Sequence, residues 1–177
     1  MERAQFSAIR ALVLGAETAA GRVLATALAA AGAHTAIVAA SPDAAVAFEV
    51  QRLSHRIGAT SQAIDATNEM AVRVMTRQLS KRLGGLDLLL FCADLGDGTT
   101  DALAMASRFA VREIARTGEG AIVIALPEGT VADIPALAAE YEPKRRLTAG
   151  RQVRVLALDV PPQPDEAWAR EVLDRLP

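Results

Sequence analysis

Short apolar runs alternate with helix-like segments along this 177-residue chain. The runs cover residues 11–14, 35–39, 61–64, 86–91, 121–126 and 153–158. Most of them do not alternate polar with apolar residues, which is typical of strands buried on both faces of a parallel sheet. Strand–helix repetition favours right-handed crossovers. We therefore expect an α/β fold, a doubly wound and mostly parallel six-stranded sheet of order 3-2-1-4-5-6 in three α/β/α layers.

The segments between these runs carry helix signals. We expect helices over residues 19–31, 43–57, 68–83, 100–116 and 165–176. Asp43 and Asn68 stand where helix caps are favoured, and Gly84 follows the third helix as a stop signal. No stretch is long enough to be a linker between domains. We expect one domain over residues 1–177.

Composition excludes several classes of partner. The net charge is −2 with both signs mixed along the chain, so nucleic acid and anionic membrane are poor candidates. Cys92 is the only cysteine, which precludes an internal disulfide and favours a reducing compartment. The first ten residues lack the apolar region of a signal peptide, and no apolar run approaches the ~20 residues of a membrane helix. We expect a cytoplasmic protein.

The turn after the first run has glycines at both ends. Residues 14–21 read Leu-Gly-Ala-Glu-Thr-Ala-Ala-Gly and lead directly into the first expected helix. Gly15 and Gly21 would let a backbone approach a pyrophosphate, and the helix N-terminus would supply free N–H groups. Glycines in such turns are also common in α/β proteins that bind no phosphate.

The order of segments resembles the short-chain dehydrogenase family. Residues 14–21 are similar to its Thr-Gly-x-x-x-Gly-x-Gly motif, and residues 64–68 to the segment whose Asp meets the adenine. Residues 85–90, 120–124 and 152–156 resemble its fourth, fifth and sixth strands. The resemblance implies a Rossmann-like domain that binds NAD or NADP. It assigns cofactor contacts to Gly15, Thr18, Ala20, Gly21, Ser41, Asp65, Ala66, Cys92 and Ala93.

Several family positions are altered at the cofactor site. Ala19 replaces the middle glycine, where its methyl group would crowd the pyrophosphate. No Asp stands near Ala39 to hold ribose hydroxyls, and no Arg stands near Ala40 to hold a 2′-phosphate. The Asn-Asn-Ala-Gly segment reads Phe-Cys-Ala-Asp at residues 91–94. We expect NAD or NADP to bind weakly or not at all, with no choice between them.

The catalytic set of the family is also incomplete. Its Ser would fall near Leu126 and Pro127, and no serine follows Ser107. Tyr141 is the only tyrosine, and Lys144 lies three residues later instead of four. In the family this Lys lowers the pKa of the Tyr, which acts as the general acid. Tyr141 and Lys144 are the catalytic candidates, although a structural role for Tyr141 explains it better.

Three classes of function remain. The first two are a catalytically silent, weak NAD(P)-binding sensor and an interaction scaffold that has lost its pocket. The third is an NAD(P)-dependent oxidoreductase with an altered Tyr–Lys centre. Loss of catalysis is the favoured interpretation. We also expect a homodimer, because the helix over residues 100–116 has an apolar stripe with Met105 and Phe109 beside it. The stripe consists of Leu103, Ala106, Ala110 and Ile114. We expect no metal site, since Asp94 and Asp97 fit a solvated loop.

Overall fold

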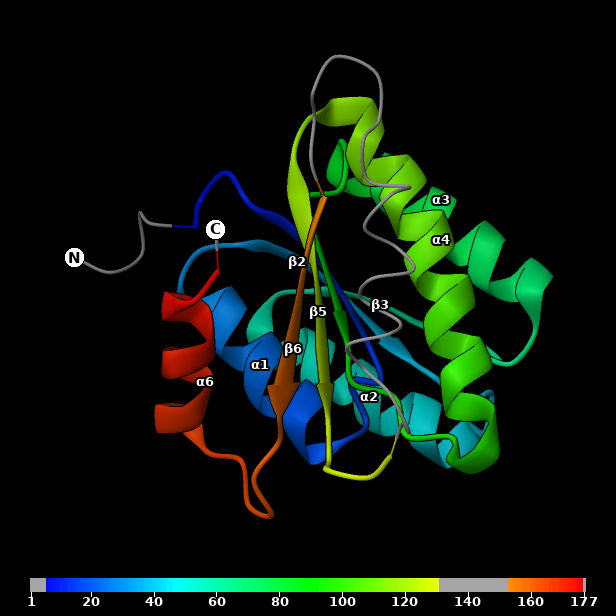
Figure 1. Ribbon diagram of the computed structural model, residues 1–177, viewed down its shortest axis with the longest axis vertical. Coiled ribbons are helices and arrows are strands. Elements are labelled where there is room, and N and C mark those ends of the chain that lie inside the picture. The colour runs from blue at the N-terminus through cyan, green and yellow to red at the C-terminus, as the bar shows by residue number, and fades with distance from the viewer. Residues whose placement is uncertain (1–5, 131–152, 177) are drawn as a thin grey trace.

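The computed structural model describes residues 6–130 and 153–176 (Figure 1). The strands are β1 (Arg10–Leu14), β2 (His34–Ala39), β3 (Thr60–Ala63), β4 (Leu88–Phe91), β5 (Gly120–Leu126) and β6 (Val153–Asp159). The helices are α1 (Ala19–Ala30), α2 (Ala44–Ile57), α3 (Glu69–Leu83), α4 (Thr99–Thr117) and α6 (Glu166–Asp174), with a 3₁₀ turn, η2 (Gly96–Gly98), before α4.

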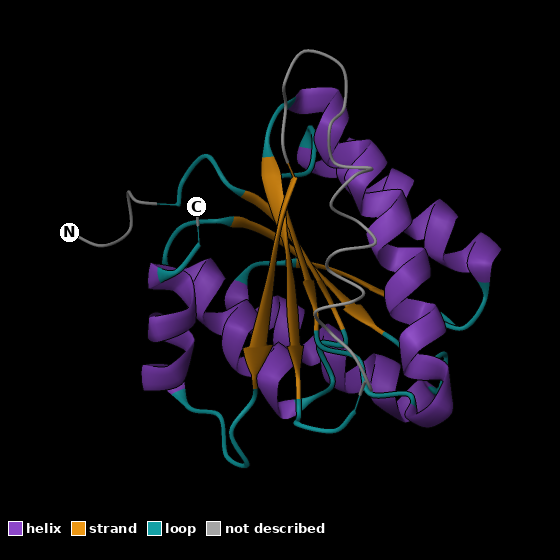
Figure 2. Ribbon diagram, viewed as in Figure 1, coloured by secondary structure: helices purple, strands orange, loops and turns teal. Residues whose placement is uncertain are grey.

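All six strands form one parallel sheet with the order β3-β2-β1-β4-β5-β6. Helices α1, α2 and α6 pack on one face of the sheet, and α3 and α4 pack on the other (Figures 1 and 2). The expected doubly wound α/β fold is confirmed in its strand order and its three layers. Because every strand is parallel, all carboxyl ends of the strands meet at one edge, which we call the carboxyl edge.

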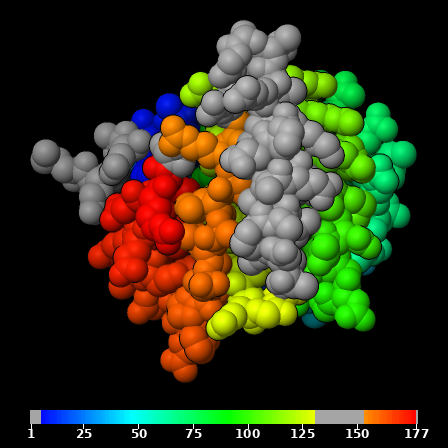
Figure 3. All heavy atoms as spheres, in the orientation of Figure 1, coloured from blue at the N-terminus to red at the C-terminus, as the bar shows by residue number. Residues whose placement is uncertain are grey.

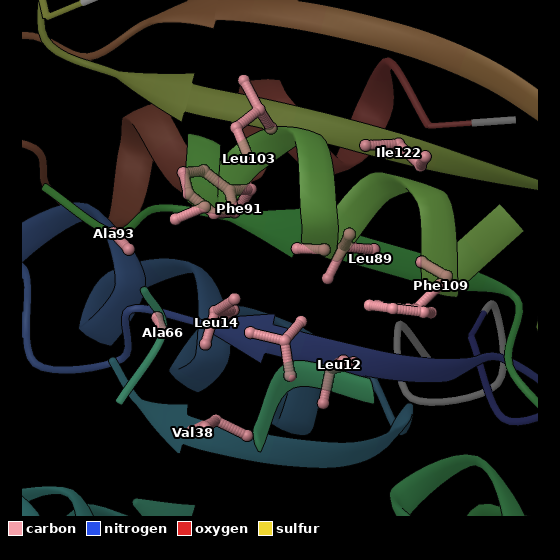
Figure 4. Packing of buried hydrophobic residues seen from close by; sticks show 14 of the residues in the cluster. Leu12, Leu14, Val38, Ala66, Leu89, Phe91, Ala93, Leu103, Phe109 and Ile122 are labelled. Carbon is pink, nitrogen blue, oxygen red and sulfur yellow. The ribbon is translucent and has the colours of Figure 1, made fainter. Parts of the chain in front are cut away.

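The sheet separates two apolar clusters. Alternate residues of each strand point to opposite faces, so Leu12 and Leu14 face α3 and α4 while Val13 faces α1. Figure 4 shows the first cluster, in which Phe91 and Leu103 fill the space between β4 and α4. With aromatics at only 3 % of the chain, small and branched aliphatic side chains supply most of this packing.

The predicted helix signals act as expected. The side chain of Asn68 accepts a hydrogen bond from the Ala71 amide at 3.0 Å and caps α3. Asp43 caps α2 by accepting from the amides of Ala45 and Val46. Gly58 and Gly84 end these two helices in the left-handed conformation that glycine adopts most readily.

Strand β4 begins two residues later than its apolar run predicts, and Asp87, just before it, makes a contact across the sheet. Its carboxylate accepts hydrogen bonds from the backbone amide of Arg10 at 2.8 Å and from the guanidinium at 2.7 and 2.8 Å. This contact holds the pKa of Asp87 below its usual range, even though burial opposes that shift. The pair fixes the amino ends of β1 and β4 relative to each other.

The last strand and helix lie together at the surface. Figure 3 shows β6 and α6 side by side on one face of the molecule. Trp168 of α6 is partly buried against the cluster that α1 and α2 also form. None of the helices in the described ranges has the length and apolar character needed to span a bilayer.

Candidate functional site

The turn from β1 into α1 is wedged between two neighbouring strands. The amides of Gly15 and Ala16 both donate to the carbonyl of Val38 in β2, at 2.9 and 3.1 Å. Gly15 has a φ of +93°, and a Cβ atom there would stand 2.3 Å from the backbone nitrogen of Ala93 after β4. Only glycine fits a position with this conformation and this approach. The turn is therefore held rigidly at the carboxyl edge.

Thr18 closes this turn as the cap of α1. Its hydroxyl donates to the carbonyl of Gly15 at 2.8 Å and accepts from the amide of Gly21 at 3.0 Å. A Cβ atom on Gly21 would lie 2.1 Å from the Gly15 carbonyl oxygen, so this glycine is also required by packing. Among the described residues, no group accepts a hydrogen bond from the amides of Ala19 and Ala20. These amides lie at a helix N-terminus, which favours an anionic ligand.

The end of β2 carries a carboxylate that comes from the turn. Both oxygens of Glu17 lie 3.2 Å from the amide nitrogen of Ala40, which donates to them. The side chain is half-buried, and this burial raises the pKa of Glu17. Ser41, a predicted contact, accepts a hydrogen bond from the Asp43 amide at 3.2 Å. Glu17 was not among the residues predicted from the sequence, because it occupies an unspecified position of the motif.

Asp65 and Ala66 follow β3 at the same edge. The exposed carboxylate of Asp65 accepts from the hydroxyl of Thr67 at 2.6 Å and from its amide at 3.0 Å. These bonds, the one from the hydroxyl first, lower the pKa of Asp65. The amide of Ala66 donates to the carbonyl of Ala40 at 3.2 Å. The ends of β2 and β3 are thus joined directly.

Cys92 and Ala93 follow β4, and their side chains are buried. Cys92 packs in the cluster on the α1 side of the sheet. Burial, with a smaller contribution from the charge of Glu17, raises the pKa of the Cys92 thiol to about 12. Figure 4 shows Ala66 and Ala93 at the same end of the sheet as Leu14. The side chains of Cys92 and Ala93 belong to the core, so only their backbone groups face the carboxyl edge.

The predicted catalytic region is described only in part. Leu126 is buried at the end of β5, and Pro127 is exposed after it. Tyr141 and Lys144 lie outside the described residues. The nearest described hydroxyl beyond β5 belongs to Thr130, which donates to the carbonyl of Pro127 at 2.7 Å.

The described connections at the carboxyl edge are uniformly acidic. They comprise residues 15–18, 40–43, 64–68, 92–98, 127–130 and 160–165, and these residues include no lysine, arginine or histidine. Their acidic residues are Glu17, Asp43, Asp65, Asp94, Asp97, Glu128 and Asp165. Apart from half-buried Glu17, all of these side chains are exposed. In residues 6–130 and 153–176, no three His, Cys, Asp or Glu side chains gather closely enough to hold a metal ion.

Two hollows on the surface lie away from this edge. One, of about 480 Å³, is lined by Arg22, Thr26 and Ala27 of α1 together with residues of α6. The other, of about 450 Å³, lies at the amino ends of β4 and β5 and includes Glu119 and Arg154. Neither includes the residues of the β1–α1 turn. We place the candidate site at the carboxyl edge, where polar groups from successive strands converge, as ligand sites do in open α/β sheets.

The family model described as short chain dehydrogenase matches residues 10–125. The chain belongs to this family. A solved short-chain dehydrogenase from Burkholderia cenocepacia J2315, in complex with NADP, is 26% identical with a TM-score of 0.69, over 88% of this chain and 74% of that one. No curated protein sequence matches the chain.

Two further solved structures show the same fold at lower identity. A short-chain type dehydrogenase/reductase from Mycobacterium marinum is 20% identical with a TM-score of 0.63, over 92% of this chain and 96% of that one. NAD⁺-bound xylitol dehydrogenase is 20% identical with a TM-score of 0.67, over 95% of this chain and 76% of that one.

Proposed function

We propose that this short-chain dehydrogenase-like chain does not catalyse hydride transfer and acts as a sensor that binds a nicotinamide dinucleotide weakly at its carboxyl edge, or else as an interaction scaffold. The observation that carries the proposal is the β1–α1 turn. Gly15, Thr18 and Gly21 form a rigid turn that leaves the Ala19 and Ala20 amides without partners among the described residues. This arrangement suits a pyrophosphate.

The adenosine half of a dinucleotide fits this edge. The pyrophosphate would meet the first turn of α1, where the exposed Ala19 methyl group would crowd it. Adenine would lie near Asp65 and Ala66, which the family resemblance assigns to it. Ala39 at the end of β2 is fully buried and offers no carboxylate to the ribose. The first turn of α1 supports binding of the nucleotide. The Ala19 methyl group and the absence of a carboxylate on β2 itself make this binding weak.

The nicotinamide half meets less favourable residues. When bound, the nicotinamide ring supplies the hydride donor or acceptor of the family's reactions. By the family resemblance, Asp94 stands where the family has glycine, and the serine that assists the catalytic tyrosine would fall near Leu126 and Pro127. No serine follows Ser107 in the sequence, so no serine beyond β5 can take over the role. These substitutions support binding without turnover.

A second candidate is an NAD(P)-dependent oxidoreductase that uses Tyr141 and Lys144. It is favoured by a single feature, the presence of a tyrosine followed three residues later by a lysine beyond β5. This candidate predicts nicotinamide turnover that Tyr141→Phe abolishes. Turnover that survives Tyr141→Phe would exclude this centre.

Calorimetric titration with NADH and NADPH tests the proposal. We expect at least one nucleotide to bind, and Ala19→Glu to weaken that binding at least about tenfold by placing a carboxylate against the pyrophosphate. The variant should fold, because α1 has no acidic residue in its first turn and an acid there stabilises a helix.

Ala30→Glu is the matched control. It adds the same charge at an exposed position at the other end of α1, about 16 Å away at 1.5 Å per residue. Equal affinity of both variants and the wild type would place any binding elsewhere. No heat up to about millimolar nucleotide would leave the scaffold role alone.

A further inference from the structure

The end of β2 has an acceptor group that the strand itself does not provide. In dinucleotide-binding folds an acidic residue near this point holds the ribose hydroxyls of NAD. Here the β2 segment reads Ala39, Ala40 and Ser41, and the Ser41 oxygen already accepts the Asp43 amide. We propose that Glu17, from the β1–α1 turn, accepts hydrogen bonds from the hydroxyls of the adenosine ribose and thereby selects NAD over NADP. The inference rests on the proposed nucleotide binding.

The turn geometry fixes where the Glu17 carboxylate lies. The amides of Gly15 and Ala16 attach the turn to the Val38 carbonyl, two residues before Ala40. The side chain of Glu17 then meets the Ala40 amide with both oxygens at 3.2 Å. The position is therefore determined by hydrogen bonds at both the backbone and the side chain. It places the carboxylate at the carboxyl end of β2, between the pyrophosphate turn and the end of β3.

A carboxylate in this position distinguishes the two nucleotides by hydrogen bonding. Its two oxygens offer about four lone-pair directions in total, of which the Ala40 amide occupies part. The remaining directions can accept hydrogen bonds from the ribose hydroxyls of NAD. In NADP the 2′-hydroxyl carries a phosphate group. When this phosphate is fully ionised, it has no proton to donate. The same carboxylate would then face a like charge.

The described connections on either side of Glu17 add no compensating cation. The connections after β1, β2 and β3, residues 15–18, 40–43 and 64–68, contain Glu17, Asp43 and Asp65 and no basic residue. In the described part of the chain, no ion pair involves Glu17. A 2′-phosphate would meet three acidic side chains along this part of the edge and no arginine or lysine from these connections. The charge distribution therefore acts in the same direction as the hydrogen bonding.

Titration of wild type and Glu17→Gln with NADH and NADPH separates this inference from the proposed function. The two nucleotides differ only in the 2′-phosphate. We expect the wild type to bind NADH at least about tenfold more tightly than NADPH. Glu17→Gln keeps an oxygen that can accept from the Ala40 amide but removes the charge, and should reduce this ratio below about threefold. Glu119→Gln, an exposed glutamate at the amino end of β5, is the control and should keep the wild-type ratio.

The effect of the 2′-phosphate can also be measured without a variant. For this, 5′-ADP and 2′,5′-ADP are used to displace NADH bound to the wild type. We expect 5′-ADP to displace it at lower concentration. Equal affinity of the wild type for NADH and NADPH, or an unchanged ratio in a folded Glu17→Gln, would overturn the role of Glu17 and leave nucleotide binding intact. Failure of the wild type to bind either nucleotide would overturn the role of Glu17 together with the proposed nucleotide-binding sensor, and would leave only the scaffold role.

Discussion

Glu17 should affect stability as well as the proposed choice of nucleotide. Burial raises its pKa in the folded state above the ordinary value of 4.5. Between these two pKa values the folded chain holds more protons than the unfolded chain. Stability therefore falls as pH rises through this interval, and the full loss is present above the raised pKa.

Glu17→Gln should remove this pH-dependent loss. At pH 7 we expect a melting temperature about 1–3 °C above that of the wild type, a shift of the size single partly buried side chains produce in a chain of this length. Thermal unfolding followed by circular dichroism between pH 4 and 8 measures it. The difference should shrink toward pH 4, where the wild-type carboxyl is also neutral. A constant difference over this range would contradict the assignment of the effect to ionisation.

Cys92 should be chemically inert in the folded protein. Its thiol is buried and has a pKa of about 12, so the reactive thiolate is scarce at pH 8. We expect iodoacetamide to label native protein at least about a hundredfold more slowly than protein unfolded in guanidinium chloride. Mass spectrometry of timed samples measures both rates. Complete labelling of the native protein at the unfolded rate would show that the thiol is accessible.

At the level of elements, the β1–α1 turn has no room for a side chain at Gly15. Gly15→Ala combines a positive φ of 93° with a Cβ atom 2.3 Å from the Ala93 nitrogen. We expect it to lower the free energy of unfolding by about 2–4 kcal/mol, measured by urea denaturation. Gly58→Ala is the control, because Gly58 has a φ of +71° and no heavy atom within 4 Å of its Cβ position. Its loss should be about 1 kcal/mol, and equal losses would mean that the close approach is relieved.

The elements themselves were largely predictable from the sequence. Apolar runs identified all six strands, and Asp43, Asn68 and Gly84 marked helix ends correctly because capping depends on local sequence. The start of β4 was not predictable. Asp87, just before it, forms an ion pair with Arg10, which lies far away in the chain and therefore leaves no local pattern in the sequence.

The candidate site was less predictable than the fold. The turn residues Gly15, Thr18 and Gly21 were identified because their backbone requirements leave a pattern in the sequence. Glu17 was missed because its role depends on the distance between the turn and β2. The acidic character of the carboxyl edge also depends on topology, since the connections that form it are separated by whole helices in the sequence.

At the level of the whole molecule, the apolar stripe of α4, on which the predicted homodimer was based, is buried within the chain itself. Leu103, a member of that stripe, is fully buried against the sheet, and Phe109 is only 6% exposed. The guanidinium groups of Arg108 and Arg112 lie 4.9 and 5.7 Å from the centre of the Phe109 ring. An interface on α4 would therefore involve its exposed arginines, Arg108 and Arg112, and partly exposed Met105.

We still expect a dimer, now with polar contacts around Arg108 and Arg112. Light scattering at micromolar concentration should give twice the 18.6 kDa of the chain. Arg112→Glu should shift the population toward monomer, whereas Arg170→Glu on α6 should not. A monomeric wild type would contradict the prediction.

The acidic residues in the described connections of the carboxyl edge also affect how fast a nucleotide should bind. A dinucleotide carries a net negative charge, so the exposed carboxylates would repel it during approach, while the amides of α1 attract it only at short range. The Debye length falls from about 30 Å at 0.01 M salt to about 10 Å at 0.1 M. Added salt should therefore speed association with this chain, whereas in an electrostatically steered enzyme it slows association.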